Sequence, residues 1–398
     1  MNDATGATRY RWLVLGIFVL STTINILDRA TLSALAPVIK QEFSLNNEDY
    51  GWITSAFSLT YAAAAPFAGI LIDSLGLNRV ISLAVGLWSC AGIATGLTAG
   101  LGGLVGWRAV LGAAEAAGIP AAGKAIHKYL RPGERALGNG VNQAGVSLGQ
   151  IIAPPLAVWI AVHYGWRHAF IATGALGLAW IPLWGWISRR VPAPDPPKQH
   201  AGAGAAMLRD RRLWTFVVAN ALSMIGYYLW FNLTTLYMVD ARGLTLQQAV
   251  RYVWIPPVFA AVGGFAGGWF SLRFIARGLP APAARFRVCL AASIVALATM
   301  AIPWLPSPAW ASAGISLSIL AVAAFSVNMY TLPLDVFGAA PAGFAIAALV
   351  SSYGFIAAIV APIIGKIIDH QGYTPVIVAV AFTPLAASAV LWFTRSTR

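Results

Sequence analysis

The chain has 398 residues, of which 59% are hydrophobic and 10% are charged, whereas soluble domains carry about 25% charged residues. A water-soluble globular protein is therefore excluded, because so few polar residues cannot cover so much apolar surface. The net charge of +13 is compatible with nucleic-acid binding, but no basic and aromatic surface element remains once the apolar segments are placed, so we expect no nucleic-acid partner.

Apolar runs separated by charged or Pro/Gly-rich segments predict an all-α integral membrane protein in the lipid bilayer, with twelve transmembrane helices of about 20 residues or more. We expect these helices over residues 12–36, 50–72, 79–99, 103–127, 138–162, 168–188, 214–239, 250–273, 286–304, 309–330, 343–366 and 374–394. Most Lys and Arg residues fall in tails and loops that share one side of the membrane. By the positive-inside rule, both termini are expected in the cytoplasm.

The segment Ser188–Leu213 is polar, basic and rich in Pro, Gly and Ala, which is typical of a cytoplasmic linker. It divides the chain into an N-terminal six-helix bundle (1–188), the linker (189–213) and a C-terminal six-helix bundle (214–398). The halves resemble each other: Gly69 and Gly268, for example, occupy equivalent positions 199 residues apart. We therefore expect two pseudo-symmetric bundles.

No pattern of a metal or catalytic site is found. Cys90 and Cys289 lie in apolar segments without a CxxC or Cys/His spacing, so we interpret them as packing residues. The sequence has no Walker A, HExxH or GxSxG motif. We expect no enzyme activity and no cofactor.

The segment Trp107–Arg135 places two charges inside an expected membrane helix. Arg108 and Glu115 are seven residues apart, which puts them on one helix face, about 10 Å apart along the axis. An ionised side chain at the bilayer centre costs about 3 kcal/mol or more and usually faces a water-filled pathway. The Gly and Ala residues around Glu115 also let another helix or a ligand approach closely. The alternative is a structural role, in which these charges form ion pairs that only hold the N-terminal bundle together.

Asp28 and Arg29 are the second pair of charges within an expected membrane helix. Together with Arg108 and Glu115 they have a formal charge of zero, so a bound monocarboxylate would add one negative charge. In a poorly solvated site this favours proton uptake by a carboxylate. Asp28 and Glu115 are therefore candidate proton-coupling residues.

Polar and aromatic residues on other expected helices are candidates for binding a substrate. In the N-terminal half these are Tyr61, Asn142 and Gln143. The C-terminal half has aromatic, amide and hydroxyl groups where the N-terminal half has charges: Tyr227 and Tyr228 stand 199 residues after Asp28 and Arg29. The C-terminal candidates are Tyr227, Tyr228, Trp230, Asn232, Asn328, Ser351, Ser352 and Tyr353. For each candidate, helix packing, interhelical hydrogen bonding or a place in the aromatic belt is the alternative.

The loop after the second expected helix runs from Gly69 through Asp73 and Gly76 to Arg79. It resembles the GxxxDxxGxxR signature of the major facilitator superfamily. We expect Asp73 and Arg79 to have a structural or gating role, in which Asp73 pairs with Arg79 or caps a helix end.

The stretch Arg108–Leu176 resembles the anion:cation symporter family, most closely bacterial hexuronate transporters. The similarity includes GAAEAA around Glu115 and PxER at Pro132–Arg135. We place Glu134 and Arg135 with the gating or structural residues. The resemblance implies a bacterial inner-membrane protein that takes up sugar acids such as glucuronate, galacturonate or aldonates with protons.

The same resemblance implies roles for four residues. Arg29 matches an arginine that pairs with the substrate carboxylate, and Arg108 and Glu115 match an arginine and a carboxylate of the fourth helix. Asp28 matches a proton-coupling acid of the aldonate branch, whereas the hexuronate branch has an uncharged residue there. The number of protons and the identity of the sugar acid therefore stay open.

We thus expect a monomeric proton symporter of an organic anion that works by alternating access. The alternatives are a transporter of another carboxylate, such as an aromatic or short-chain acid, and a drug or metabolite exporter on the same fold. An exporter would be expected to lack the two arginines. A transporter-like sensor would need a sizeable soluble output domain, and the longest polar stretch is only the linker.

Overall fold

The computed structural model describes residues 3–191 and 207–393, and within them all regular secondary structure is helical. Eleven helices of this described part are long and apolar enough to cross a membrane. Most of the expected linker (192–206) lies outside the described residues. The chain divides into two compact units, one formed by Met1–Ile39 and Ala56–Gln199 and the other by Lys40–Ser55 and His200–Arg398.

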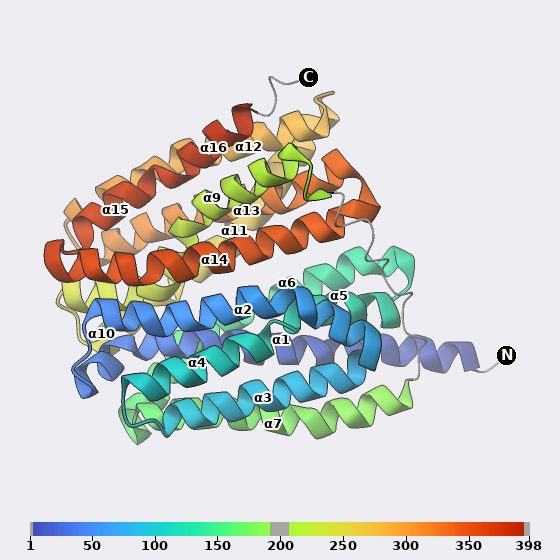
Figure 1. Cartoon of the computed structure of the whole chain (residues 1–398), viewed down its shortest axis with the longest axis horizontal. Helices are drawn as coiled ribbons and strands as arrows, with labels where there is room; N and C mark the ends of the chain where they lie inside the picture. The colour runs from blue at the N-terminus through green and yellow to red at the C-terminus, as the bar shows by residue number, and fades with distance from the viewer. Residues whose placement is uncertain (1–2, 192–206, 394–398) are drawn as a thin grey trace. The chain divides into compact units, whose positions relative to one another are not determined.

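In the described residues, the first unit, called unit 1 below, is built from seven α-helices and a short 3-10 helix (Figure 1). They are most of α1 (Asp3–Glu42), most of α2 (Asn47–Leu75), α3 (Leu77–Gly96), α4 (Leu101–Glu115), α5 (Gly118–Tyr129), η1 (Pro132–Glu134), α6 (Arg135–Tyr164) and α7 (Trp166–Arg190).

The second unit, unit 2, contains the remaining helices and the α1–α2 connection. Its helices are α9 (Arg211–Leu236), η2 (Tyr237–Ala241), α10 (Leu246–Val253), α11 (Ile255–Ala276), α12 (Ala281–Ala296), η3 (Leu297–Trp304), α13 (Pro308–Phe337), α14 (Ala339–Gln371), α15 (Tyr373–Ala381) and α16 (Thr383–Phe393).

One membrane helix differs from its expected form. Instead of one helix over 103–127, the structure has α4 and α5, separated by a turn at Ala116 and Ala117. Pro120 has no N–H to donate to the carbonyl of Ala116, which explains why the helix is interrupted at this point. Each piece is too short to count among the eleven spans. The interruption begins directly after Glu115 and therefore places this acid at a helix end.

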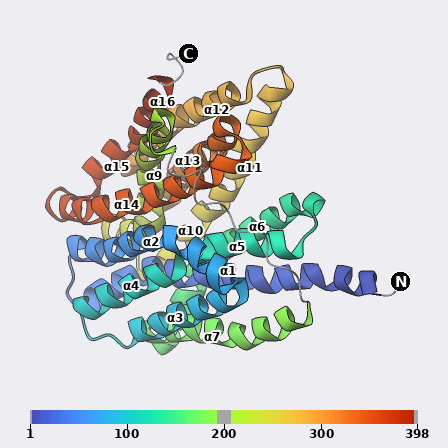
Figure 2. The ribbon, with the colours of Figure 1, turned by 45° about the vertical axis from the view of Figure 1, so that its right-hand side comes forward.

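In unit 1, α3 packs along both α7 and α4, and Figures 1 and 2 both show α3 and α7 side by side. Glycines allow this close approach: a Cβ atom at Gly174 would lie 2.6 Å from the carbonyl oxygen of Ser89, and one at Gly96 would lie 2.7 Å from that of Arg167. Small residues at helix crossings are the usual means of packing helices in a bilayer.

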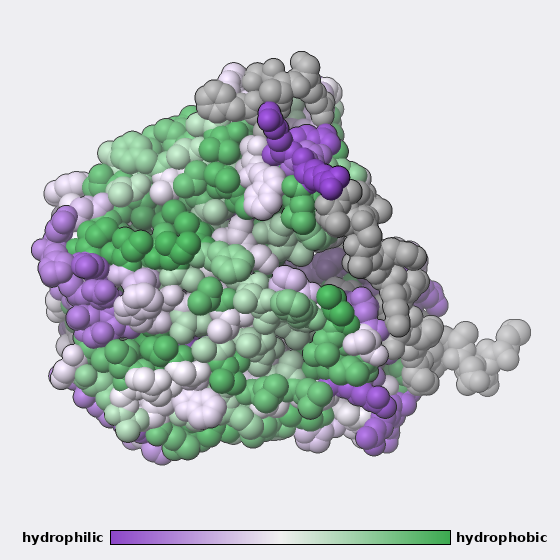
Figure 3. All heavy atoms as spheres, in the orientation of Figure 1, coloured by the Kyte–Doolittle hydropathy of each residue, from purple (hydrophilic) through white to green (hydrophobic). Residues whose placement is uncertain are grey.

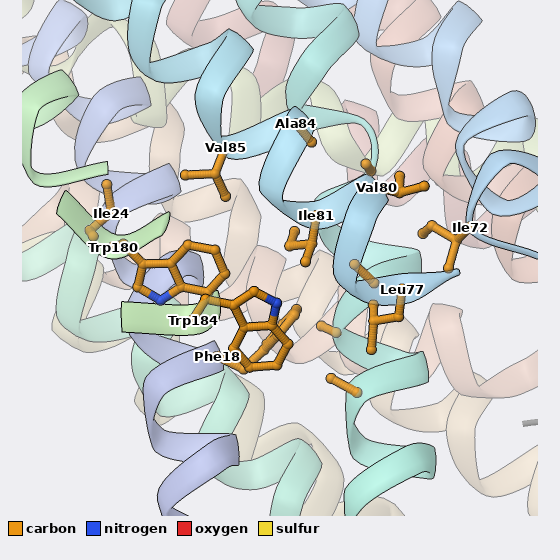
Figure 4. Close-up of a cluster of buried hydrophobic side chains, with 14 of the residues drawn as sticks. Phe18, Ile24, Ile72, Leu77, Val80, Ile81, Ala84, Val85, Trp180 and Trp184 are labelled. Carbon is orange, nitrogen blue, oxygen red and sulfur yellow. The ribbon is translucent and has the colours of Figure 1, made fainter. Parts of the chain in front are cut away.

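A large apolar core fills the space between α1, α3 and α7 (Figure 4). Trp180 and Trp184 stack with ring centroids 5.4 Å apart, and Phe18 meets Trp184 edge to face at 5.6 Å. The indole nitrogen of Trp180 donates to the carbonyl of Ile17 at 2.6 Å. This core fixes α1 against α7 and so orients the polar residues farther along α1.

In unit 2, α13 packs along α11 and α12, and α9 packs against α14 and α16. Gly263 and Gly267 bring α11 onto α13; a Cβ atom at Gly267 would lie 2.7 Å from the Cα atom of Ala324. The start of α2 also belongs to this unit. The Asp369 carboxylate accepts hydrogen bonds from the backbone nitrogens of Asn47 and Glu48, both at 2.9 Å, and so caps the N-terminus of α2.

Large apolar side chains are exposed along the helices of each unit, for example Phe67 (68%) and Leu83 (61%) in unit 1 and Phe265 (77%) in unit 2. In Figure 3 hydrophobic residues cover the lengths of the visible helices, and hydrophilic residues gather near the helix ends. This distribution matches a hydrocarbon environment. The predicted all-α, multi-pass membrane protein is confirmed.

Candidate functional site

Unit 1 joins Arg29 on α1 to Glu115 at the end of α4. The guanidinium Nε donates a hydrogen bond to Oε2 of Glu115 and forms an ion pair with it. The Glu115 side chain is fully buried, while 20% of the Arg29 side chain is exposed. The sequence placed both residues in one site, and the structure brings them into direct contact.

The Arg29 guanidinium also lies over two aromatic rings of α2. Its central carbon is 4.9 Å from the ring centroid of Phe57 and 4.6 Å from that of Tyr61. The two rings stack on each other with centroids 5.8 Å apart. Cation–π contacts of this kind orient a guanidinium without using its N–H donors. Tyr61, a predicted substrate ligand, is thus placed beside Arg29.

Asp28 faces a different part of unit 1 from Arg29. A Cβ atom at Gly92 of α3 would lie 3.9 Å from Oδ1 of Asp28 and 3.9 Å from the Cα atom of Gly174 of α7. The residue is 2% exposed, and neither carboxylate oxygen has a hydrogen-bond partner among the described residues. The nearby Thr173 hydroxyl of α7 donates instead to the carbonyl of Phe170 at 3.2 Å.

Arg108, on α4, is also directed toward α7. It is 3% exposed, and its guanidinium carbon lies 5.5 Å from the ring centroid of Phe170. Arg29 and Glu115 therefore form an ion pair beside α2, while Asp28 and Arg108 each lie near residues of α7 and within electrostatic range of Glu115. In the described residues no group of three or more His, Cys, Asp or Glu side chains is placed to hold a metal ion.

The two amides predicted on the fifth expected helix differ in their surroundings. The Asn142 oxygen accepts a hydrogen bond from the Thr22 hydroxyl of α1 at 3.0 Å, seven residues before Arg29. Gln143, the next residue along α6, is exposed. Asn142 is therefore held against α1, the helix that carries Arg29, while a role of Gln143 in substrate binding stays a prediction.

Several predicted ligands in unit 2 have internal hydrogen bonds. The indole nitrogen of buried Trp230 donates to the Ser318 hydroxyl at 3.0 Å, and the Tyr228 hydroxyl lies 2.9 Å from that of Thr54. The Asn232 amide donates to the carbonyl of Tyr228 at 3.0 Å. These bonds lie within unit 2 and stabilise its packing.

Asn328 and Ser352 also form hydrogen bonds within unit 2. The Asn328 amide donates to the carbonyls of Gly267 at 3.1 Å and Ala324 at 2.9 Å. The Ser352 hydroxyl donates to the carbonyl of Leu349 at 2.8 Å. Both residues are buried and tie neighbouring helices together.

The remaining unit 2 candidates, like Asn232, are half-buried: Tyr227, Tyr353 and Ser351. Tyr227 stacks on Phe231 with centroids 5.9 Å apart and meets Tyr353 edge to face at 6.3 Å. Aromatic faces of this type suit an apolar sugar face better than a charged group.

The predicted gating residues form contacts in unit 1. Asp73 forms an ion pair with Lys124 of α5, whereas Arg79, its expected partner, is exposed. The reason is that the carboxylate lies beside α5, whose lysine reaches it. Glu134 pairs with Arg11 at 3.2 Å, and Arg135 donates to the carbonyl of His127 at 3.4 Å.

Two residues of the site were not predicted from the sequence: Phe57, beneath Arg29, and Asn25. Asn25 precedes Arg29 by one helical turn and therefore shares its helix face; it is 7% exposed and lies next to Glu115. The i, i+4 spacing to Arg29 was the signal that could have identified it.

A family model described as the Major Facilitator Superfamily matches residues 18–359. The chain belongs to the Major Facilitator Superfamily. Membership confirms the predicted superfamily and makes the protein a membrane transporter, not an enzyme.

The hexuronate transporter of Escherichia coli (strain K12) is 28% identical to this superfamily member over 410 residues, which cover 96% of this chain and 93% of the relative. The galacturonate transporter of Dickeya chrysanthemi is 30% identical over 285 residues, 66% of this chain and 82% of the relative. A crystal structure of a bacterial homolog to the human lysosomal transporter Spinster matches with a TM-score of 0.82 and 21% identity over 96% of both chains, which shows a shared fold.

Proposed function

We propose that this transporter imports a hexuronate or a related sugar acid, such as glucuronate, galacturonate or an aldonate, together with protons and by alternating access. Support comes from the names of the relatives and from the Arg29–Glu115 pair in unit 1. The two-bundle division near residues 188 and 213, a monomeric state, and an inner-membrane location with cytoplasmic termini belong to the same proposal.

The proposal depends most on the difference in exposure between Arg29 and its acidic partner Glu115. Arg29 is 20% exposed and Glu115 is fully buried. A guanidinium has five N–H donors, so the bond from Nε to Glu115 leaves donors for a substrate carboxylate. The stacked rings of Phe57 and Tyr61 hold the guanidinium in place for this contact.

Competition for Arg29 provides a mechanism of proton coupling. A substrate carboxylate at Arg29 weakens the bond to Glu115, and a buried carboxylate that loses its counter-charge is unfavourable. Glu115 then takes up a proton, which keeps the loaded site from gaining a net negative charge. Asp28, buried without a hydrogen-bond partner among the described residues, is the candidate for a second proton.

The roles that we propose for the other candidate ligands follow from their contacts and burial. Asn142 contacts α1 and is a hydroxyl ligand in this proposal, and Arg108 remains a candidate to bind the substrate carboxylate. In unit 2 we assign sugar recognition to Tyr227, Tyr353 and Ser351, which are half-buried; Asn232 is half-buried too, but its amide donates to the carbonyl of Tyr228.

The direct test is a counterflow assay in proteoliposomes with labelled galacturonate, glucuronate, galactonate and an aromatic acid, each at equal pH on both sides. We expect exchange of at least one sugar acid, inhibition by an excess of the unlabelled acid, and no inhibition by neutral galactose. Exchange of the aromatic acid alone would replace the sugar-acid assignment with that of another carboxylate. A wild-type protein that exchanges none of these acids would contradict the proposal.

A further inference from the structure

The first turns of α2 pack along α14 with a four-residue spacing. A Cβ atom at Gly51 would lie 2.5 Å from the carbonyl oxygen of Ala361. Four residues earlier on α2 and four residues later on α14, a Cβ atom at Gly365 would overlap the carbonyl of Asn47. One helical turn is about four residues, so these contacts lie on one antiparallel line, and the two helices meet backbone to backbone without a side chain between them.

Polar groups hold both ends of this line. The Ser55 hydroxyl, one turn beyond Gly51, donates to the carbonyl of Ala358 at 2.7 Å. At the other end, the Asp369 carboxylate accepts from Nδ2 of Asn47 at 2.7 Å, in addition to the two backbone bonds that cap α2. Because a carboxylate at a helix N-terminus is also attracted by the helix dipole, Asp369 should contribute most to the contact. We call the contact the α2–α14 seam; its residues are Asn47, Glu48, Gly51 and Ser55 of α2 and Ala358, Ala361, Gly365 and Asp369 of α14.

The start of α2 does not depend on Asp369 alone. The backbone nitrogen of Asp49 donates to Oδ1 of Asn46 at 2.7 Å, and that of Asn46 donates to Oδ2 of Asp49 at 3.1 Å, which is a reciprocal capping box. The helix α10 begins 199 residues later with a box of the same type between Thr245 and Gln248. The bonds to Asp369 are thus additional to a cap that α2 carries in its own sequence, and they can break while the helix stays folded.

A second set of polar contacts beside the seam is accessible to water. The Lys40 ammonium donates to Oδ1 of Asn47 at 2.6 Å and lies 3.4 Å from Oδ2 of Asp240, whose side chain is 34% exposed. The Tyr373 hydroxyl donates to the same carboxylate oxygen at 3.1 Å. Asp369 is itself exposed. Exposed ion pairs and hydrogen bonds exchange with water at a small cost in free energy, so the polar links at this end of the seam suit a contact that is repeatedly made and broken.

We propose that the α2–α14 seam is a gate that opens and closes in each transport cycle, and that Asp369 is the positioning residue that holds it closed. This inference rests on the proposed function, in which access alternates between the two sides of the membrane. Opening exchanges the bonds from Asn47 and Glu48 to Asp369 for bonds to water, and no proton is transferred. The helix α2 also carries Phe57, which contacts Arg29, so the gate and the candidate site share one helix.

The first test joins the two sides of the seam. The Asn47 and Asp369 side chains meet at 2.7 Å, so Asn47→Cys and Asp369→Cys together, in a background with Cys90→Ala and Cys289→Ala, place two thiols within reach of a short bifunctional thiosulfonate. Galacturonate or glucuronate counterflow in proteoliposomes should fall to the background rate after cross-linking and return when a reductant cleaves the link. The reagent should not change the rate of either single cysteine variant. A cross-linked protein that exchanges as fast as the reduced one would show a seam that stays closed during transport, and would overturn the inference.

The second test measures opening without a substrate. Ser55 is 6% exposed, so Ser55→Cys, in the same background and in lipid nanodiscs, should react slowly with a water-soluble maleimide. Asp369→Asn removes the charge at the N-terminus of α2 and should raise the labelling rate about two- to tenfold, whereas Asp369→Glu keeps the charge and should raise it less. Asp335→Asn is the matched control, because it breaks an ion pair with Arg285 in the same unit but outside the seam. It should leave the labelling rate unchanged.

A static cap and a gate give different results. If Asp369 only caps α2, Asp369→Asn should lower the melting temperature but leave the labelling rate of Ser55→Cys unchanged, and that result would overturn the inference. A wild type that exchanges no sugar acid would instead contradict the proposed function, while a raised labelling rate in Asp369→Asn would still support the gate.

Discussion

Replacement of Arg29 by lysine separates the geometry of the cation from its charge. The guanidinium of Arg29 donates from Nε to Glu115 and lies over Phe57 and Tyr61 at 4.9 and 4.6 Å. A lysine ammonium keeps the positive charge but has no planar fork. It cannot grip a substrate carboxylate with two parallel N–H groups.

The magnitude follows from the bonds that lysine cannot make. At least one charge-assisted hydrogen bond to the substrate carboxylate is lost, and such a bond contributes about 1.5–3 kcal/mol. Since about 1.4 kcal/mol corresponds to a tenfold change in affinity, Arg29→Lys should weaken substrate binding about ten- to a hundredfold. The rings of Phe57 and Tyr61 also orient a lysine ammonium less well than a guanidinium. We therefore expect a loss of affinity nearer to a hundredfold.

The assay measures substrate binding to the purified protein at fixed pH. The readout is the rise in melting temperature as the ligand concentration is increased. Arg167→Lys is the matched control. Arg167 lies 4.6 Å from the ring centroid of Trp166 and donates to the carbonyl of Thr98 at 3.3 Å, so it reports the general effect of replacing a ring-stacked arginine in unit 1. If Arg29→Lys binds galacturonate and glucuronate as tightly as the control does, Arg29 is a structural cation and the reasoning is refuted.

Three further substitutions test other parts of the site. Glu115→Gln mimics the protonated acid, so counterflow at equal pH should persist while accumulation driven by a proton gradient is lost; accumulation at the wild-type level would remove Glu115 from the coupling step. Asp28→Asn should abolish the net inward positive charge that two protons and one monoanion carry, measured as current on a solid-supported membrane; electroneutral wild-type uptake would exclude the two-proton scheme. Gly112→Ala should lower the melting temperature and the exchange rate, because its Cβ atom would overlap the Phe57 carbonyl and such overpacking costs about 1–3 kcal/mol. Gly106→Ala on the same helix has open space around the new methyl group, and an equal loss there would show that the α2–α4 contact is not the cause.

The sequence was sufficient to predict the fold because hydrophobic length is a strong signal in a membrane protein. Each span needs enough apolar residues to cross the bilayer, and backbone groups must pair within the helix. The interruption after Glu115 was missed although its signal, Pro120, was present. An apolar run does not show whether a proline kinks a helix or splits it, because neighbouring groups can satisfy the freed carbonyl.

The charged part of the site was more accessible to prediction than the neutral part. Arg29 and Glu115 were conspicuous because ionised groups are rare within membrane helices, and the structure places them in contact. The roles proposed for Trp230 and Asn328 were harder to derive, since an indole or an amide serves equally as a ligand and as a link between helices. The structure gives both residues internal partners within unit 2. Their contact with the substrate stays a prediction.

The separation of the charges within unit 1 explains why Asp28 and Arg29, though adjacent in sequence, need not act as a pair. Neighbouring helix positions point about 100° apart, and here one side chain meets Glu115 and Phe57 while the other faces Gly92 and Thr173. A substrate carboxylate that engages Arg29 therefore acts on Glu115 by direct competition and on Asp28 only through the field of the site. Competition for a hydrogen bond is strong and local, whereas a field effect depends on the solvent that reaches the site. Glu115 should consequently be the acid whose protonation is tied to substrate occupancy, and Asp28 the acid whose protonation sets the charge carried per cycle.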